Sequence, residues 1–325
     1  MKFSGRILTL AAALALAAAF PTIVHAQVSC GDTIYGDTTL TNHVRCEDIT
    51  SGVVNKTALT VGADGVTIDL AGYAMKCIGQ YGAPQHCQAL GWVGINTNGY
   101  SNVTIKNGTV EDFAVGIHVN GGGNVTVRDL TVTGPSWNPV VYVDRAQATA
   151  ILVQGVACRE GALIDGNTVN NHRFGIKVVA SRCVKVQRNT VTENDGAGTE
   201  SHGILLLNSS GNTITTNFVN DNGAEVAGCG GITLAGTSSD NRVARNTALR
   251  NCGDGISARD TADSNTISGN SARSNPPGQF SQCSSLTGYF DLADNSSGVN
   301  NKWARTNDCW TEGGSVPTDV CNLGE

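Results

Sequence analysis

A small residue followed by isoleucine recurs along the chain, and this repeat constrains the fold more than any other feature. The spacings between successive pairs are 22, 34, 25, 28, 28 and 24 residues. The pairs are Gly94-Ile95, Gly116-Ile117, Ala150-Ile151, Gly175-Ile176, Gly203-Ile204, Gly231-Ile232 and Gly255-Ile256. Short segments between them alternate apolar and polar residues, as in Val103-Thr104-Ile105. Strands this short cannot bury a face alone, but the stacked coils of a solenoid can. The repeat therefore predicts an all-β parallel solenoid with three short strands per coil.

A second periodic line consists of Asn or Asp. Its members are Asn107, Asp129, Asn167, Asn189, Asn217, Asn246 and Asn270. Asn tolerates the left-handed backbone of a tight corner, and stacked amides can bond along the axis. We therefore expect these residues to form one ladder at one corner. A β-propeller or a β-sandwich is the alternative, but propeller blades repeat nearer 40 residues and sandwiches do not repeat.

Composition excludes two broad classes. Charged residues make up 15% of the chain and glycine contributes 40 of 325 residues, which disfavours an all-helical fold. A net charge of -6 argues against nucleic-acid binding, which needs a basic stripe to meet phosphates.

The first 26 residues have the pattern of a secretory signal peptide. Lys2 and Arg6 precede an apolar run over 7–20, and Ala26 stands at the expected cleavage position before Gln27. No later stretch is apolar enough to span a bilayer, so we expect a secreted or periplasmic protein and no membrane span. We divide the rest into an N-terminal cap region (27–62), a parallel β-helix (63–275) and a C-terminal coil and cap (276–325).

Several units resemble a known repeat. They are Gly211-Asn212-Thr213-Ile214, Ser264-Asn265-Thr266-Ile267 and the opening Cys30-Gly31-Asp32-Thr33-Ile34. Over about residues 30–308 the chain resembles the right-handed parallel β-helix repeat proteins of the pectate-lyase-like superfamily. The resemblance implies a single-stranded right-handed parallel β-helix. That superfamily includes polysaccharide lyases, glycoside hydrolases, epimerases, esterases and proteins without known activity, so it implies carbohydrate chemistry without fixing a reaction.

The 11 cysteines predict disulfides, because an exported chain meets an oxidising compartment. Cys158 and Cys183 each lie eight residues after the start of neighbouring coils, and coils rise by about 4.8 Å, within the reach of a disulfide. Cys229 and Cys252 precede neighbouring starts by two and three residues. The predicted pairs are Cys158–Cys183, Cys229–Cys252, Cys30–Cys46 and Cys77–Cys87, with one of Cys283, Cys309 and Cys321 left over. A zinc site is the alternative, but no pair has Cys-x-x-Cys spacing, so we predict no metal among the cysteines.

The lengths of the coils indicate where a site lies. Nearly all length variation falls just before the Gly-Ile strand, giving long loops at 134–149, 193–202 and 221–230. The coil that starts at Gly175 has a short loop between long-looped coils, so we expect it to form the floor of a groove. Alternation within Ile176-Lys177-Val178 predicts that Lys177 points outward. Arg259 should face the same way about three coils along the axis, too far to take part.

Basic residues gather on this predicted floor and suit an anionic sugar. β-Elimination on a uronate needs a partner for the carboxylate, a base for the C5 proton and a donor for the leaving oxygen. We expect Arg173 to hold the carboxylate, Lys177 or neutral His202 to act as base, and Tyr142 or His172 as donor. The further substrate-binding candidates are His118, Trp137, Tyr142 and Glu200. Calcium is a possible cofactor for neutralisation, with Asp195, Glu200 and Glu225 on the right edge. Each of these assignments has a structural alternative. Lys177 could be a solvated lysine, 172–173 a turn and His202 a filler residue of the repeat. Asp254 is interpreted as a turn residue.

Three functions remain open at this point. A secreted lyase that cleaves a uronate-containing polysaccharide leads, as a monomer with no other partner. The outward positions hold no acid, which disfavours hydrolysis; they are Asn96, His118, Leu152, Lys177, Leu205, Thr233 and Ser257. Apolar members of the same face favour the alternative, a non-catalytic carbohydrate-binding or surface structural protein. Similarity to periplasmic copper-site maturation proteins is weaker, because copper(I) prefers Met and Cys and only Met75 follows the leader.

Overall fold

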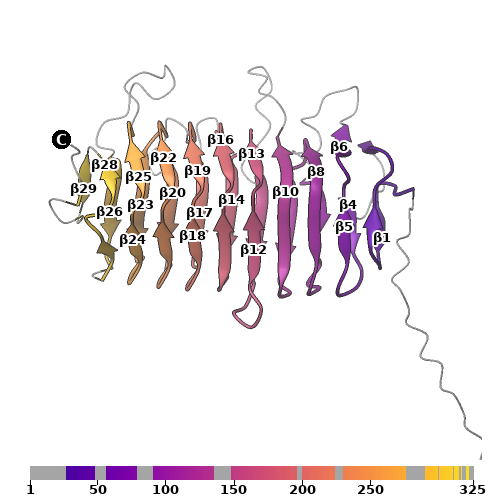
Figure 1. Ribbon diagram of the computed structural model, residues 1–325, viewed down its shortest axis with the longest axis horizontal. Helices are drawn as coiled ribbons and strands as arrows, with labels where there is room; N and C mark the ends of the chain where they lie inside the picture. The colour runs from indigo at the N-terminus through magenta and orange to yellow at the C-terminus, as the bar shows by residue number, and fades with distance from the viewer. Residues whose placement is uncertain are drawn as a thin grey trace, which may run out of the picture.

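The chain forms a column of parallel coils, and strand follows strand along its long axis (Figure 1). A computed structural model describes residues 27–47, 56–78, 91–134, 148–195, 200–223, 230–275, 290–298, 300–309, 311–314, 316 and 320–321. Within these ranges every regular element is a β-strand, and no helix is long and apolar enough to cross a membrane. The predicted all-β right-handed parallel β-helix with three strands per coil is confirmed. The boundaries of the cap regions stay predictions.

Three parallel sheets run along the sides of the column, and each complete coil contributes one strand to each. Sheet 1 contains the Gly-Ile strands: β1 Asp32–Ile34, β4 Thr57–Val61, β7 Val93–Asn96, β9 Val115–Asn120, β11 Thr149–Gln154, β14 Phe174–Val179, β17 His202–Leu207, β20 Gly230–Ala235, β23 Asp254–Asp260, β26 Leu292–Ser296 and β29 Glu312–Gly314. Sheet 2 contains β2 Thr38–Thr39, β5 Thr67–Asp69, β12 Ala162–Asp165, β15 Val184–Gln187, β18 Thr213–Thr215, β21 Arg242–Ala244, β24 Thr266–Ser268 and β27 Lys302–Trp303. Sheet 3 contains β3 Val44–Glu47, β6 Ala74–Ile78, β13 Thr168–Asn170, β16 Thr190–Thr192, β19 Phe218–Asn220, β22 Thr247–Leu249, β25 Ser271–Arg273 and β28 Asp308–Cys309. Strands β8 (Thr104–Glu111) and β10 (Val125–Thr133) run through the corner between sheets 2 and 3 and belong to both.

The register places the repeated isoleucines on top of one another inside the column. Ile151 pairs with Ile117 on one side and with Ile176 on the other, and all three are fully buried. Where glycine precedes the isoleucine, close approach leaves no room for a side chain: a Cβ on Gly175 would lie 2.5 Å from the backbone oxygen of Gly203. The alternation of inward and outward residues therefore fixes which side chains of sheet 1 face solvent.

Buried asparagine side chains stack along the axis in three rows rather than one. In row 1 each Nδ2 donates to the Oδ1 of the next member, at 3.0 Å throughout: Asn167, Asn189, Asn217, Asn246, Asn270 and Asn307. Row 2 comprises Asn194, Asn222, Asn251 and Asn275, and row 3 comprises Asn212, Asn241, Asn265 and Asn301. Rows 2 and 3 end on carboxylates, because Asn275 donates to Asp291 and Asn301 to Asp294.

The predicted ladder was wrong at its start and in one of its two stated causes: the side-chain amides do bond along the axis, but the left-handed backbone is not that of the row members. Asn107 pairs in register with Asp129, but the residue aligned with Asn167 is Leu130, whose N–H donates to Asn167 Oδ1. The left-handed backbone belongs to the residue before each row member, such as Arg188 (φ 55°) before Asn189. Asparagine is therefore selected here for its buried amide, not for its tolerance of positive φ.

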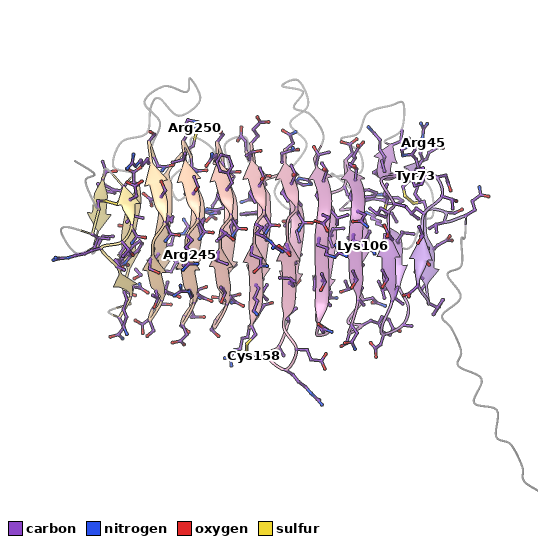
Figure 2. All side chains as sticks on the ribbon, in the orientation of Figure 1. Arg45, Tyr73, Lys106, Cys158, Arg245 and Arg250 are labelled. Atoms are coloured by element: carbon purple, nitrogen blue, oxygen red, sulfur yellow. A yellow bond between two sulfur atoms is a disulfide. The ribbon has the colours of Figure 1, made fainter. Side chains whose placement is uncertain are left out.

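Disulfides join neighbouring coils and close both ends. Cys158–Cys183 and Cys30–Cys46 form as predicted, and the Cα atoms of the first pair are 4.9 Å apart. Cys158 lies in a turn at the lower edge of the column (Figure 2). Cys309 pairs with Cys321, and Cys77 and Cys252 are disulfide-bonded. Their predicted partners Cys87 and Cys229, like Cys283, lie outside the described residues.

Candidate functional site

The outer face of sheet 1 carries the predicted site residues at one repeated position. Strand pairing aligns His118, Leu152, Lys177, Leu205, Thr233 and Ser257, in this order along the axis. Lys177 is partly exposed between the fully buried Ile176 and Val178, as the predicted outward register requires. Between sheets 3 and 1, the segments 135–147, 196–199 and 224–229 lie outside the described residues, and these segments include Trp137 and Tyr142.

A hydrogen-bonded network, which we call the His202 network, occupies this face at strands β17 to β23. His202 begins β17, and its Nδ1 lies 2.9 Å from Thr233 Oγ1, which lies 3.3 Å from Ser257 Oγ. On the other side of the ring, Nε2 lies 3.2 Å from Glu200 Oε1. The same carboxylate oxygen accepts a hydrogen bond from Arg259 Nη2. Three polar side chains, those of Thr233, Glu200 and Arg259, thus surround the His202 imidazole, and Ser257 joins the network through Thr233.

Burial keeps the imidazole of His202 neutral. The side chain has no exposed surface, and desolvation lowers the pKa of His202 to about 4. The hydrogen bond from His202, with the nearby Arg259 charge, lowers the pKa of Glu200 to about 2. We assign the remaining proton to Nε2, because an ionised carboxylate can only accept. Nδ1 then accepts from Thr233, which leaves the Thr233 oxygen to accept from Ser257.

Two cations lie over the aromatic ring beside this network. The Phe174 ring is stacked on His202, with centroids 6.0 Å apart and planes inclined by 16°. Lys177 Nζ lies 4.3 Å and Arg173 Cζ 4.8 Å from the centroid of Phe174, within cation–π range. Burial and the neighbouring Arg173 charge lower the pKa of Lys177. The Arg173 Nε donates to the backbone oxygen of Glu200 at 2.5 Å, so β14 and the segment before β17 are tied together.

The sequence analysis did not assign two charged residues to this part of the face, Arg259 and Asp254. Arg259 was expected to be a distant bystander, but its side chain reaches back along the face to Glu200 and lies 3.1 Å from His202 Nε2. Asp254 was interpreted as a turn residue, but it begins β23, is 7% exposed and accepts from the Phe290 N–H. Burial raises the pKa of Asp254 to about 6.

Other predicted residues lie apart from the network. His172 is buried at the corner before β14, where its Nδ1 lies 2.8 Å from the backbone oxygen of Asn170. His118 lies two strands before Lys177, and burial lowers its pKa. In the described part of the chain no three His, Cys, Asp or Glu side chains are placed to hold a metal ion. Glu225, a suggested calcium ligand, falls outside that part.

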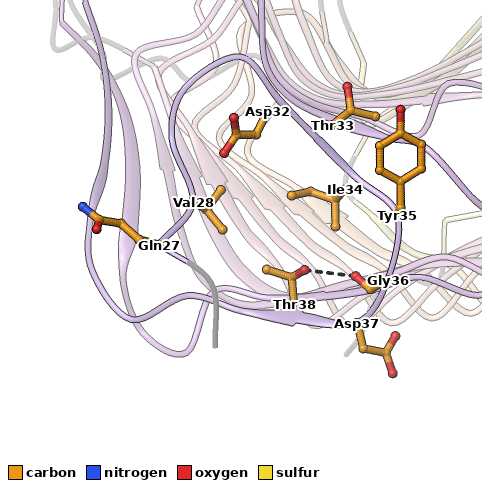
Figure 3. A pocket seen from close by; sticks show the side chains of 9 residues that line it. All are labelled: Gln27, Val28, Asp32, Thr33, Ile34, Tyr35, Gly36, Asp37 and Thr38. Carbon is orange, nitrogen blue, oxygen red and sulfur yellow. Dashed lines mark hydrogen bonds between the residues drawn. The ribbon is translucent and has the colours of Figure 1, made fainter. Parts of the chain in front are cut away.

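A separate hollow of about 280 Å³ lies at the N-terminal end, lined by Gln27, Val28 and residues 32–38 (Figure 3). It surrounds β1, six strands before β17 in the order of sheet 1, which is about 29 Å at the usual strand spacing. Both carboxylates of its lining already accept from backbone N–H groups, Asp32 from Ser29 at 2.7 Å and Asp37 from Thr67 at 2.8 Å. The hollow is an opening at the end of the column and is unconnected with the His202 network.

Comparison with known proteins identifies a family and a shared fold. The sequence matches the family described as "Right handed beta helix region" over residues 93–272 and 199–307. No curated protein matches the chain in sequence.

Solved structures share the architecture at low sequence identity. The periplasmic alginate epimerase AlgG is 15% identical over 82% of this chain and 70% of its own, with a TM-score of 0.51. The DFA-IIIase from Arthrobacter chlorophenolicus A6, in complex with GF2, is 13% identical over 91% and 76%, with a TM-score of 0.53. The Dettilon tailspike protein is 16% identical with a TM-score of 0.48, and the chain spans 55% of its length. Identities this low show the fold alone.

Proposed function

The chain belongs to the right-handed β-helix family, and from this premise we propose that it is an exported enzyme that cleaves a uronate-containing polysaccharide by β-elimination. The observation that carries the proposal is the gathering of Arg173, Lys177 and Arg259 on one outer face of a protein whose net charge is -6. Glu200 is the one carboxylate of the His202 network that opposes them, and the buried Asp254 lies on the same strand as Arg259. A local excess of positive charge on an acidic protein favours an anionic ligand.

Lys177 is the proposed base. Partial burial and the Arg173 charge lower its pKa, so the ammonium group releases its proton more easily and can then accept one from the substrate. Elimination moves the C5 proton of the uronate to Nζ, breaks the bond between C4 and the glycosidic oxygen, and leaves a C4–C5 double bond. Arg173 would neutralise the carboxylate and so acidify that proton, and Tyr142 remains the proposed donor to the leaving oxygen.

Glycoside hydrolysis fits these side chains less well. It uses two carboxyl groups, one of which must be protonated near neutral pH. Glu200 has its pKa lowered to about 2 and is held by Arg259, so it is a poor acid. Asp254 has a raised pKa but is 7% exposed and engaged with the backbone of Phe290.

A non-catalytic carbohydrate-binding protein is the second candidate. Phe174, Leu205 and Ala235, with the partly buried Leu207, form an apolar cluster separate from the core of the column. An apolar strip beside cations suits binding of a sugar chain without any reaction. The similarity in fold to an alginate epimerase and to an enzyme solved with GF2 is compatible with either candidate.

Export is part of the same proposal. Disulfides join Cys30 to Cys46, Cys158 to Cys183 and Cys309 to Cys321, and such bonds persist in oxidising compartments. Together with the signal-peptide pattern of residues 1–26, they support a secreted or periplasmic location.

Ultraviolet absorbance of the purified protein with a panel of uronate polymers tests the reaction. Elimination creates a conjugated double bond, so absorbance should rise with a cleaved polymer and stay flat with Lys177→Ala. A flat trace across the panel, together with polymer binding by calorimetry, would support the non-catalytic candidate instead.

A further inference from the structure

We propose that Arg259 and His202 form a carboxylate-binding site that Glu200 occupies in the free protein, and that a uronate carboxylate takes the place of Glu200 when polysaccharide binds. The inference rests on the proposed function for the identity of the ligand. The site itself rests on the geometry of the described residues.

Both donors of this site converge on a single carboxylate oxygen. Glu200 Oε1 accepts from Arg259 Nη2 and lies 3.2 Å from His202 Nε2, which carries the proton. The His202 side chain is unexposed and that of Arg259 is 20% exposed, whereas that of Glu200 is 43% exposed. The donors are therefore built into the sheet face, and the carboxylate comes to them from the solvent side. An external carboxylate can approach from the same direction.

The His202 donor keeps its orientation without Glu200. The His202 ring is fixed by Thr233 at Nδ1 and by stacking on Phe174, and Thr233 is fixed in turn by Ser257. A preorganised donor loses little freedom when it binds a ligand. The site should therefore survive the departure of the Glu200 carboxylate.

Departure of Glu200 requires only a side-chain movement. Its backbone oxygen is held by Arg173 Nε at 2.5 Å, independently of the carboxylate. Rotation of the side chain would move the carboxylate into solvent and leave the backbone in place. The lowered pKa of Glu200, about 2, shows that this environment favours a carboxylate anion over the neutral acid.

A uronate polymer has an advantage over the internal carboxylate. It carries a carboxylate on successive sugars, so it can engage Arg259 and the pair Arg173 and Lys177 on β14 together, which Glu200 cannot do. Linked contacts of this kind raise the effective concentration of the second group. Glu200 would then act as a competitor that weak or singly charged ligands fail to displace.

Titration with sodium glucuronate tests the site without any polymer. We would compare wild type, Glu200→Ala, Glu200→Gln and the double variant Glu200→Ala/Arg259→Gln, using calorimetry and glucose plus matched sodium chloride as the reference. If Glu200 fills the site in about nine of ten molecules, its removal tightens apparent glucuronate binding about tenfold. The double variant should lose that gain. Glu193→Gln, an exposed acid before the same strand, should bind as wild type does.

Two outcomes would overturn the proposal. One is that both folded Glu200 variants bind glucuronate no more tightly than wild type. The other is that they gain affinity equally with and without Arg259. Should Glu200→Ala fail to fold, Glu200→Gln decides, because it keeps the shape and removes the charge. A gain in glucuronate binding with no binding or cleavage of any uronate polymer would leave the carboxylate site standing and remove the proposed function.

Discussion

Replacement of Asn217 by alanine tests whether the asparagine rows hold the coils together. Asn217 is 2% exposed, and its Nδ2 donates to the backbone oxygen of Val186 at 2.9 Å and to Asn246 Oδ1 at 3.0 Å. Its Oδ1 accepts from the backbone N–H of Asn189 at 3.0 Å. Asn217→Ala therefore withdraws a partner from two buried backbone groups, Val186 O and Asn189 N. At about 1–3 kcal/mol for each, the free energy of unfolding should fall by about 2–6 kcal/mol.

Urea unfolding followed by far-ultraviolet circular dichroism, with the disulfides intact, measures this loss. Hydrogen exchange locates it, because the amide of Asn189 should lose protection. Asn120→Ala, at an exposed position of β9, is the matched control and should change stability by about 0.5 kcal/mol or less. A loss below about 1 kcal/mol for Asn217→Ala, close to that of the control, would refute the reasoning that the buried amides are structural cross-links.

Three further predictions concern the site and the scaffold. In steady-state kinetics, Lys177→Ala should lower turnover of a cleaved polymer by about 10²-fold or more, and Arg173→Ala should change both KM and kcat. Full activity in both variants would place the reaction elsewhere. Burial raises the pKa of Asp254 from 3.8 to about 6, so ionisation of Asp254 lowers the stability of the fold as pH rises through this window. Asp254→Asn keeps the acceptor for Phe290 and should be about 2–3 kcal/mol more stable than wild type at pH 7, with little gain at pH 4. Urea titrations at both pH values would show this difference. Cys158→Ser opens a bond that spans 25 residues and should cost about 3 kcal/mol of unfolding free energy, and an unchanged urea midpoint would contradict this.

The coil architecture could be predicted because it depends on equal spacing. Residues at the same offset from each Gly-Ile pair meet in the structure, which is why Cys158 and Cys183 bond and Ile151 lies between Ile117 and Ile176. In a parallel stack the offset alone fixes both the neighbour and the face.

Equal spacing along the sequence predicted the wrong ladder residues where a strand runs through a corner. In β8 and β10 the ladder position is filled by Gly108 and Leu130, and the polar residues Asn107 and Asp129 stand one place earlier with positive φ. The sequence shows Asn or Asp at a similar spacing in either case. Only the backbone conformation distinguishes a buried ladder asparagine from a corner residue with positive φ.

The candidate site was predictable in position but incomplete in membership. Loop lengths placed Arg173, His202 and Glu200 beside the coil that starts at Gly175, and the two-residue period of the strand predicted that Lys177 points outward. It could not show that Arg259 reaches back from β23, since a long flexible side chain ends several ångströms from its Cα. Nor could it show that His172 and Asp254 are buried, because burial at a corner depends on the coils on both sides.

The asparagine rows also give the column an electrical direction. Along each row the Oδ1 of an amide faces the preceding coil and one N–H of its Nδ2 points to the next coil toward the C-terminal end, so the individual dipoles add as they do along an α-helix. Partial positive charge accumulates at the C-terminal end of each row. Asp291 and Asp294 stand there as the last acceptors of rows 2 and 3, which places negative charge where an aligned set of dipoles is best stabilised by it. A solenoid whose described elements are all β-strands thus acquires an axial polarity, with its own charged caps, from side chains alone.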